Sequence, residues 1–464
     1  MSTESESTPR LIRRPVFSTL WRMALPMLGG TFAMNSFNLA DTWFVAKLGT
    51  VPLAAMGFSF PVVMVLITLS LGLGMGATTV VSHAFGANHH ELAKRLTTHA
   101  MILCVLIVVI VSIVGLLTID PVFRALGAGT EVLPAIRGYM QVWYLGVVFL
   151  VIPMVANNVI RATGDTVRPS IIMAITSVLN IILDPIFIFG FGFIPAMGIQ
   201  GAALATVLAR AISCFAALWI LIYKYDLITF VRLRWSDVWH SWKAVMRIGL
   251  PSCVTQILMP VAGAIITWLL AQHGPAAVAA SGVAGRLEMF AFMIPMALGI
   301  SLVPFIGQNF GAGRLDRVKE GMFYANTFAF GYGLIVAVVF WTFAPQLGGL
   351  FSQDEEVIRV LTDYLRIIPL GYGLLEVQRY SGFLMNAINL PMQSLWLNAL
   401  RILALLIPLS LIGDEVFGLV GVFWGRLIAD VVSGTVGIIW AIVLLRKVRA
   451  RLAEDKPEEQ GALP

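Results

Sequence analysis

The chain is built from long, continuous apolar runs separated by short polar segments. A helix of about 20 residues can cross the roughly 30 Å of hydrocarbon in a bilayer. The runs therefore predict twelve membrane-spanning helices, at 22–47, 53–82, 95–119, 136–161, 169–191, 200–223, 247–272, 278–309, 320–343, 361–388, 392–412 and 418–445. Because the runs are continuous rather than alternating, they do not fit a transmembrane β-barrel. We predict an all-α integral membrane protein.

The pattern also repeats itself within the chain. "VPLAAMGFSF" (51–60) and "AAVAASGVAG" (276–285) share A-A-x-G at an offset of 225 residues, and "HAFGANHHELAK" (83–94) aligns with "QNFGAGRLDRVK" (308–319) at the same offset. Gly198 and Gly201 align with Gly418 and Gly421 at an offset of 220. Six helices in each half leave both halves in the same orientation, so we predict two six-helix bundles related by a parallel repeat, as found among transporters.

The repeat and the polar segments together predict the domain organisation. We expect a cytoplasmic N-terminal tail (1–21), an N-terminal bundle (22–223), a cytoplasmic linker (224–246), a C-terminal bundle (247–445) and a cytoplasmic C-terminal tail (446–464). The linker is rich in aromatic and basic residues, so it is either an amphipathic segment on the inner leaflet or a plain connector. The polar ends, 2–8 and 454–464, are expected to be disordered.

Composition agrees with a membrane protein, and the charge distribution sets its orientation. The chain is 58% hydrophobic and 12% charged, with a net charge of +6. If the N-terminus is cytoplasmic, 21 Lys and Arg lie in inner segments and four, Lys47, Arg124, Arg137 and Arg359, in outer ones. This bias predicts that both termini face the cytoplasm. The basic excess therefore reflects topology, and we expect no nucleic-acid partner.

Two aspartates inside apolar runs are the main candidates for function. Asp41 follows Asn38 by three residues and Asp184 follows Asn180 by four, so each shares a helix face with an amide. Neither has a cation one helical turn away, and a carboxylate in a membrane costs roughly 2.5–3.5 kcal/mol on insertion scales. Carboxylate and amide oxygens without a fixed cation suit Na⁺ or a proton. Asn157 adds a further polar group, and a purely structural role in helix packing remains the alternative.

The repeat favours the functional interpretation of these acids. Asp41 aligns with Ile266, and Asp184 aligns within the acid-free stretch "ALLIPL" (404–409). A packing role would be expected in both halves, whereas a coupling site is needed only once. Other intramembrane acids have cations nearby: Arg426 and Asp430 are spaced i,i+4, and Glu376 and Arg379 i,i+3. Glu288 and Glu376 nevertheless lie deep enough to contribute to a site in the second half.

Other chemistry finds little support in the sequence. The chain lacks the G-x-x-x-x-G-K-[ST] motif of ATP-driven proteins, and its three cysteines suggest neither disulfides nor a metal site. The first apolar run is too long for a cleavable signal peptide. We expect no enzymatic activity and no resident cofactor, only a coupling ion, H⁺ or Na⁺.

Several motifs together give the chain a family resemblance. "NLADTWFVAKLG", "RATGDTVRPS", "LNIILDP", "GIQGAALAT" and "QNFGAG" resemble those of the multidrug and toxic compound extrusion (MATE) family over essentially the whole chain. The resemblance implies two bundles in a V shape, alternating access, and a cation site at Asp41, Asn180 and Asp184. Asn157, Tyr139 and Thr206 are further candidates. Met259 stands where the NorM-type branch has an acid, so the chain is more similar to the DinF-type branch.

The combined prediction is a secondary-active multidrug efflux transporter of the cell inner (plasma) membrane, multi-pass and monomeric. It would export lipophilic or cationic organic compounds in exchange for H⁺ or for Na⁺ held by Asp41, Asn180 and Asp184. One alternative is a flippase for lipid or cell-envelope precursors, which would need a strongly cationic cavity. A second alternative is an integral-membrane enzyme acting on lipids, which would need an acid cluster at the membrane interface.

Overall fold

The computed structural model describes residues 10–229 and 234–454; of the two ends predicted to be disordered, residues 2–8 and 455–464 lie outside these ranges. Contacts divide the chain into two compact units, the first comprising residues up to Arg14 and Ser18–Ile257 and the second Pro15–Phe17 and residues from Leu258 onward. Within the described residues the only β feature is an isolated bridge between Phe191 and Ile194. All regular structure described is therefore helical, as the apolar runs predict.

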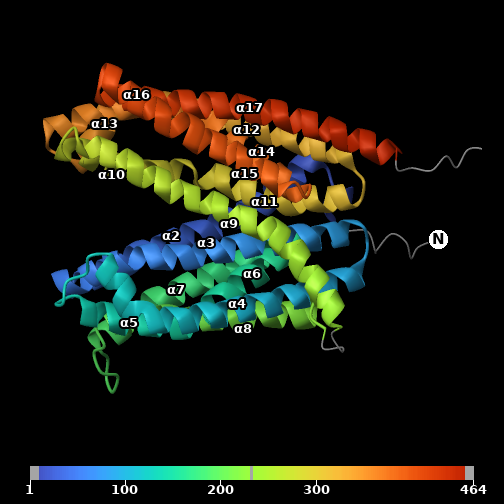
Figure 1. Ribbon diagram of the computed structural model, residues 1–464, viewed down its shortest axis with the longest axis horizontal. Coiled ribbons are helices and arrows are strands. Elements are labelled where there is room, and N and C mark those ends of the chain that lie inside the picture. The colour runs from blue at the N-terminus through green and yellow to red at the C-terminus, as the bar shows by residue number, and fades with distance from the viewer. Residues whose placement is uncertain (1–9, 230–233, 455–464) are drawn as a thin grey trace, which may run out of the picture. The chain divides into compact units, whose positions relative to one another are not determined.

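The first half of the chain contains nine α-helices and one π-helical turn. They are α1 (Arg10–Arg13), α2 (Val16–Ala46), α3 (Thr50–Gly86), α4 (His90–Ala125), α5 (Leu133–Gly146), α6 (Val148–Ala162), α7 (Val167–Phe189), α8 (Ile199–Trp219), η1 (Ile220–Lys224) and α9 (Trp235–Ala271). In Figure 1 these helices, blue to yellow-green, run lengthwise beside one another. The core of the first unit lies among α3, α4, α5, α6 and α8, where Leu73, Ile136 and Ile160 are fully buried.

The second half contains α-helices and two short irregular turns. They are α10 (Pro275–Ala291), α11 (Met293–Gly311), α12 (Leu315–Phe351), α13 (Glu355–Ile367), η2 (Ile368–Gly371), α14 (Tyr372–Ala387), α15 (Pro391–Ala399), η3 (Leu400–Leu406), α16 (Ile407–Phe417) and α17 (Leu419–Glu454). α14 packs against α12 and α17, and α16 packs along α17. The η3 segment is a seven-residue π-helix that interrupts α15 and α16.

The twelve predicted spans correspond to helices or broken helices of the structure. In the described part of the chain, nine helices are long and apolar enough to cross a membrane, and the bent pair α5–α6 gives a tenth. The two further spans are α2 and the broken helix α13–α14, which are more polar. α2 carries Asp41, and α13 carries five charged side chains in addition to Glu376 and Arg379 of α14, which makes these two spans more polar than the others.

Two predicted boundaries differ from the observed helices. α2 begins at Val16 rather than at residue 22, and α17 continues to Glu454, into the predicted C-terminal tail. Residues 235–246 of the predicted linker 224–246 belong to α9, which begins at Trp235 and runs unbroken into the next span, and residues 230–233 lie outside the described ranges. The amino-terminal half of α9 is held by the first unit, where the Trp242 Nε1 donates to the His99 carbonyl oxygen at 2.9 Å. This packing explains why the helix starts early.

Backbone conformations confirm the internal repeat. Residues with positive φ recur 225 positions apart, as Gly49 (108°) and Gly274 (97°), Asn88 (59°) and Gly313 (70°), and Gly164 (93°) and Asn389 (63°). At the offset of 220, Gly198 (55°) matches Gly418 (61°). Left-handed backbone favours Gly and Asn. The two halves therefore carry these residues at matching turns.

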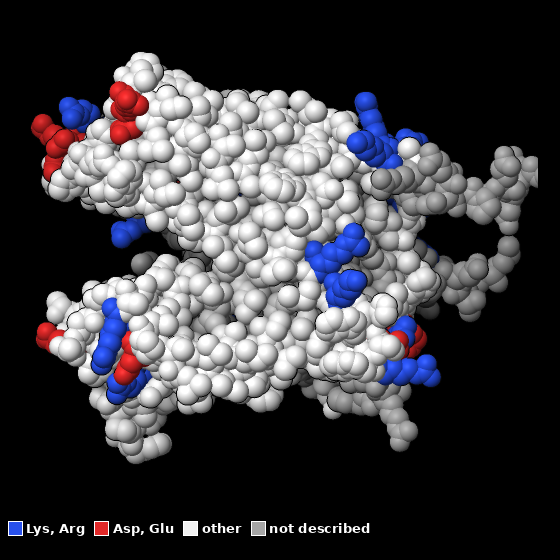
Figure 2. Space-filling view, in the orientation of Figure 1, with Lys and Arg blue, Asp and Glu red and all other residues white. Residues whose placement is uncertain are grey.

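The surface fits a protein surrounded by lipid. On the face shown in Figure 2, charged side chains gather mainly near the helix ends, and most of the surface between them is uncharged. Large apolar residues such as Leu117 (77%) and Trp219 (61%) are exposed on spans that could cross a bilayer. Lipid contact makes such exposure favourable, whereas in water a large apolar surface would be an interaction site.

Among the glycines of the described residues, Gly421 leaves the least room for a Cβ, and this gives a first prediction. A Cβ at Gly421 of α17 would lie 1.8 Å from the Gly413 carbonyl oxygen of α16. Because that atom belongs to a helix backbone, Gly421→Ala must push α16 and α17 apart, and overpacking of this kind costs about 1–3 kcal/mol. We expect a lower thermal unfolding midpoint in detergent. Gly331→Ala in α12 is the matched control, since nothing lies within 4 Å of a Cβ there; an equal loss in both variants would contradict the prediction.

Candidate functional site

α7 brings an amide and a carboxyl of the predicted cation site together. Asn180 and Asp184, four residues apart on α7, are both buried, and Asp184 is 0% exposed. In the amide orientation that satisfies its neighbours, Asn180 accepts from the Thr206 hydroxyl of α8 at 3.1 Å and donates to Asp184 Oδ2 at 3.2 Å. Pro185 has no backbone N–H, so the Ile181 carbonyl also lacks its helical donor.

Asp41 and Tyr139 lie close to this pair. Asp41 of α2 is 9% exposed, and its carboxyl is near enough to Asp184 for the two charges to interact. Tyr139 of α5 is buried and lies within electrostatic range of both carboxyls. Five of the predicted residues, Asp41, Tyr139, Asn180, Asp184 and Thr206, therefore gather inside the first unit. They come from four different helices.

Some carboxylate oxygens of this group lack a hydrogen-bond donor. Within the described residues, neither Asp41 Oδ1 nor Asp184 Oδ1 has a hydrogen-bond partner. No cationic side chain in the described part of the chain pairs with either carboxyl. Buried oxygens without donors are costly, and a proton or a hard cation would satisfy them.

Asn157 is placed differently from its neighbour Asn158. Asn157 is buried and its Oδ1 has no partner among residues 10–229 and 234–454, so it could face a ligand. No hydrogen bond in those ranges joins it to Asp41 or Asp184. Asn158 donates to the Met154 carbonyl oxygen at 3.0 Å and accepts from Arg161 at 2.7 Å, which ties it to its own helix, α6.

In the second unit, Glu288 has a charge partner. Its Oε1 accepts from Arg426 Nη2 at 2.7 Å, from Tyr364 at 2.7 Å and from Tyr372 at 2.8 Å. Arg426 also donates to the Tyr364 hydroxyl at 2.5 Å. The Glu288 carboxylate is thus paired with a cation and accepts three hydrogen bonds on Oε1, in contrast with the carboxyls of Asp41 and Asp184.

The remaining buried acids of the second unit are also paired. Glu376 accepts from Arg379 at 2.6 Å, which confirms the pair predicted from their spacing. The predicted Arg426–Asp430 pair is only a 4.0 Å contact. Asp430 is instead held by Arg401, whose Nε lies 2.8 Å from Oδ1, because η3 brings this arginine to α17.

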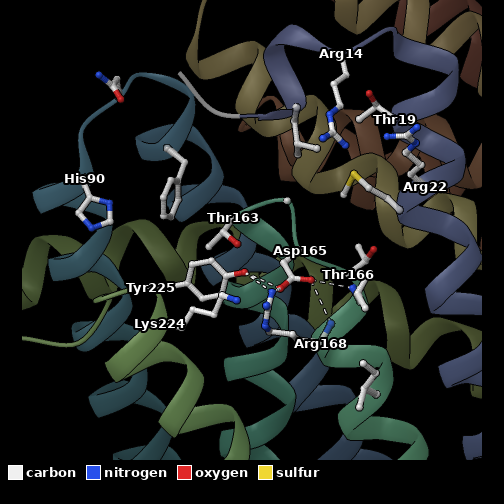
Figure 3. A pocket seen from close by; sticks show the side chains of 17 residues that line it. Arg14, Thr19, Arg22, His90, Thr163, Asp165, Thr166, Arg168, Lys224 and Tyr225 are labelled. Atoms are coloured by element: carbon white, nitrogen blue, oxygen red, sulfur yellow. Dashed lines mark hydrogen bonds and ion pairs between the residues drawn. The ribbon is translucent and has the colours of Figure 1, made fainter. Parts of the chain in front are cut away.

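A cavity of the first unit lies apart from the predicted cation site, at the ends of several helices. It has a volume of about 1130 Å³ and is bordered by α1, α2, α4, the 163–166 loop and η1. Figure 3 shows Arg14 and Arg22 on one side of this basic pocket and Lys224, Tyr225 and His90 on the other. This pocket could not be predicted from the sequence, because the residues that line it come from separate segments of the chain.

Among the described residues that line the basic pocket, Asp165 is the only acid, and its carboxylate accepts hydrogen bonds from its neighbours. It accepts from Tyr225 at 2.6 Å and from Arg168, and its Oδ1 accepts from the backbone N–H of Val167 at 3.0 Å. Burial works to raise the pKa of Asp165, but the hydrogen bonds from Tyr225 and Arg168 outweigh it and leave the pKa below its ordinary value. Burial and Asp165 raise the pKa of Tyr225 to about 12, so this phenol stays protonated as a donor near neutral pH.

Comparison with known proteins gives one consistent result. Residues 26–186 and 251–412 match the MatE family. The chain is 34% identical over 412 residues to the FAD transporter of Shewanella oneidensis, covering 89% of this chain and 91% of that protein. It is 28% identical over 454 residues to the multidrug export protein MepA of Staphylococcus aureus, covering 96% and 97%. The crystal structure of the Vibrio cholerae MATE transporter VcmN in the bent form matches with a TM-score of 0.88 at 33% identity, covering 93% and 97%.

Proposed function

Because the chain belongs to the MatE family of transporters, we propose that it is a secondary-active transporter that exports organic compounds in exchange for H⁺ or Na⁺, coupled through Asp41, Asn180 and Asp184. It is a transporter rather than an enzyme. Transporters of this family handle small organic substrates. The observation that carries the coupling proposal is the pair of buried carboxyls in one bundle with unpartnered oxygens and no cation beside them.

The chemistry of the pair explains how an ion could drive transport. Two nearby carboxylates repel each other and are poorly solvated inside the bundle. When the site is closed to water, the form that holds a proton or Na⁺ is therefore more stable than the form with two free carboxylates. A proton or Na⁺ neutralises part of the charge and satisfies an orphan oxygen. Since α2, α5, α7 and α8 all contribute side chains, loading the site changes the contacts between four helices. Pro26 in α2 is the proposed point of bending.

The proposed substrates are lipophilic, cationic organic compounds, by analogy with the multidrug export protein. The name of the Shewanella relative suggests a second class, flavin nucleotides, which are anionic. We also propose the DinF-type branch, because Met259 occupies the position of the NorM-type acid and contacts Arg401 at 3.5 Å. The charge bias supports an inner-membrane protein with both termini cytoplasmic, and we propose that it acts as a monomer.

Transport in proteoliposomes tests the proposal. The full chain is reconstituted, a pH or Na⁺ gradient is imposed, and movement of a fluorescent lipophilic cation is followed. We expect one of the two gradients to drive uptake against the substrate gradient, and an ionophore that collapses the gradient to stop it. Indifference to both gradients would refute ion-coupled antiport.

The flippase alternative is not favoured by the comparisons, and three arginines that could make a cavity within the bundles cationic already have neighbours. Arg379 is paired with Glu376 and Arg401 with Asp430. In the first unit, Arg210 stacks over Phe37 with its guanidinium carbon 5.7 Å from the ring centroid. Arginines with carboxylate partners have little charge left for a pyrophosphate.

A further inference from the structure

The basic pocket of the first unit has a charge imbalance that the coupling site does not explain. Four cationic side chains, Arg14, Arg22, Arg168 and Lys224, line it, against one carboxylate, Asp165. Asp165 and Arg168 neutralise each other. Arg22 and Lys224 are exposed to the pocket, and no described residue forms an ion pair or hydrogen bond with either.

The orientation of the chain in the membrane does not by itself explain why these cationic side chains line one cavity. The positive-inside rule is met by cations anywhere on the inner side, and it does not require them to converge on one cavity. The internal repeat allows the two cations to be compared with the residues at the matching positions of the second half. Arg22 aligns with Arg247 at the offset of 225, whereas Lys224 aligns with Leu444 at the offset of 220 that applies near the end of each half, so Lys224 is not repeated in the second half.

The geometry suits an anion of a particular kind. The cavity of about 1130 Å³ is slightly larger than most small-molecule sites, which measure roughly 300–1,000 Å³, and it is large enough for a nucleotide or a lipid headgroup. Arginine offers a planar fork of donors that matches phosphate, and lysine adds a mobile point charge. Arg22 lies on α2 and Lys224 at the end of η1, so a ligand between them is contacted from two sides, as Figure 3 shows.

We propose that the basic pocket binds a phosphate-bearing anion, held mainly by Arg22 and Lys224. The phosphate can belong to a phospholipid headgroup or to a soluble compound with a phosphate or pyrophosphate group. The inference rests on the proposed orientation of the transporter, since it places the pocket on the cytoplasmic side. It does not depend on the coupling site.

Binding to the full-length protein tests the proposal without any ion gradient. Inorganic pyrophosphate and, separately, FAD are titrated calorimetrically onto the delipidated protein in neutral detergent. In the lipid arm, thermal unfolding is compared in nanodiscs of phosphatidylcholine with and without phosphatidylglycerol. The variant is Arg22→Gln/Lys224→Gln, and the matched control is Arg247→Gln/Lys447→Gln, which removes the same two charges outside the pocket.

We expect the variant to lose affinity by about tenfold or more while the control is unchanged, since it removes two charged donors of strong hydrogen bonds to the anion. Binding should also weaken as salt is raised. Loss of pyrophosphate or FAD binding in the variant identifies a soluble ligand. Loss of only the phosphatidylglycerol-dependent stabilisation identifies a lipid headgroup. Equal behaviour of variant and control in both arms would overturn the proposal, whatever the outcome of the transport assay.

Discussion

Asp184→Asn is expected to slow gradient-driven transport strongly while leaving the protein folded. Asparagine has the size of aspartate and can still accept from Asn180, so the contact at 3.2 Å between α7 side chains can be kept. It cannot take up a proton or supply a charge for Na⁺. Coupling energies between sites are typically 1–3 kcal/mol, so we expect the coupled rate in proteoliposomes to fall about 5- to 150-fold. Asp41→Asn should behave in the same way, since both carboxyls belong to one group of oxygens.

Asp226→Asn is the control for this prediction. Asp226 is an exposed acid of the same unit, paired with Lys94 at 2.7 Å on the surface. Its φ is 49°, a conformation that asparagine also accepts, so the substitution changes charge without strain. Equilibrium binding of the exported compound should be measured beside transport. Unchanged coupled transport in Asp184→Asn would refute the site, whereas lost substrate binding would show that Asp184 contacts the compound rather than the ion.

The parts of the fold that follow from local pattern could be predicted from the sequence. The helices arise from continuous apolar runs, because a membrane requires every backbone group to be satisfied within its own segment. The repeat could be predicted because Gly198 and Gly418 mark the same left-handed turn in both halves. The acids of the coupling site could be found because a carboxylate is rare in such runs. The acids come together inside one unit because of how the helices pack, and the spacing of residues in the sequence does not reveal that packing.

The parts that depend on contacts between distant segments could not be predicted. An i,i+4 spacing favours Arg426–Asp430, but Asp430 is bound by Arg401, 29 residues away in the sequence. The π-helical η3 adds to the difficulty, because it changes the helical phase within a span whose sequence gives no sign of it. The start of α9 at Trp235 likewise depends on packing against the first unit, through contacts such as that between Trp242 and His99.

The Arg401–Asp430 pair is expected to be the most sensitive single contact of the second unit. The two side chains are 4% and 0% exposed, and Arg401 reaches Asp430 with both Nε and Nη2 at 2.8 Å. Arg401→Met keeps most of the side-chain volume but leaves Asp430 with only Arg426, 4.0 Å away. Removing one partner of a buried ion pair costs about 3–5 kcal/mol, because the other charge is left uncompensated. The free energy of unfolding, measured by titration with a denaturing detergent, should fall by that amount.

A double-mutant cycle separates the interaction energy of the Arg401–Asp430 pair from the cost of leaving one buried charge without a partner. Arg401→Met/Asp430→Leu removes both charges, and it should recover most of the stability that either single variant loses. Lys94→Met at the exposed Lys94–Asp226 pair is the control, with an expected loss of at most about 1 kcal/mol. If Arg401→Met costs no more than Lys94→Met, the buried pair does not hold α17 to η3. If the double variant is stable and still transports with full coupling, this ion pair is structural, and coupling does not require it.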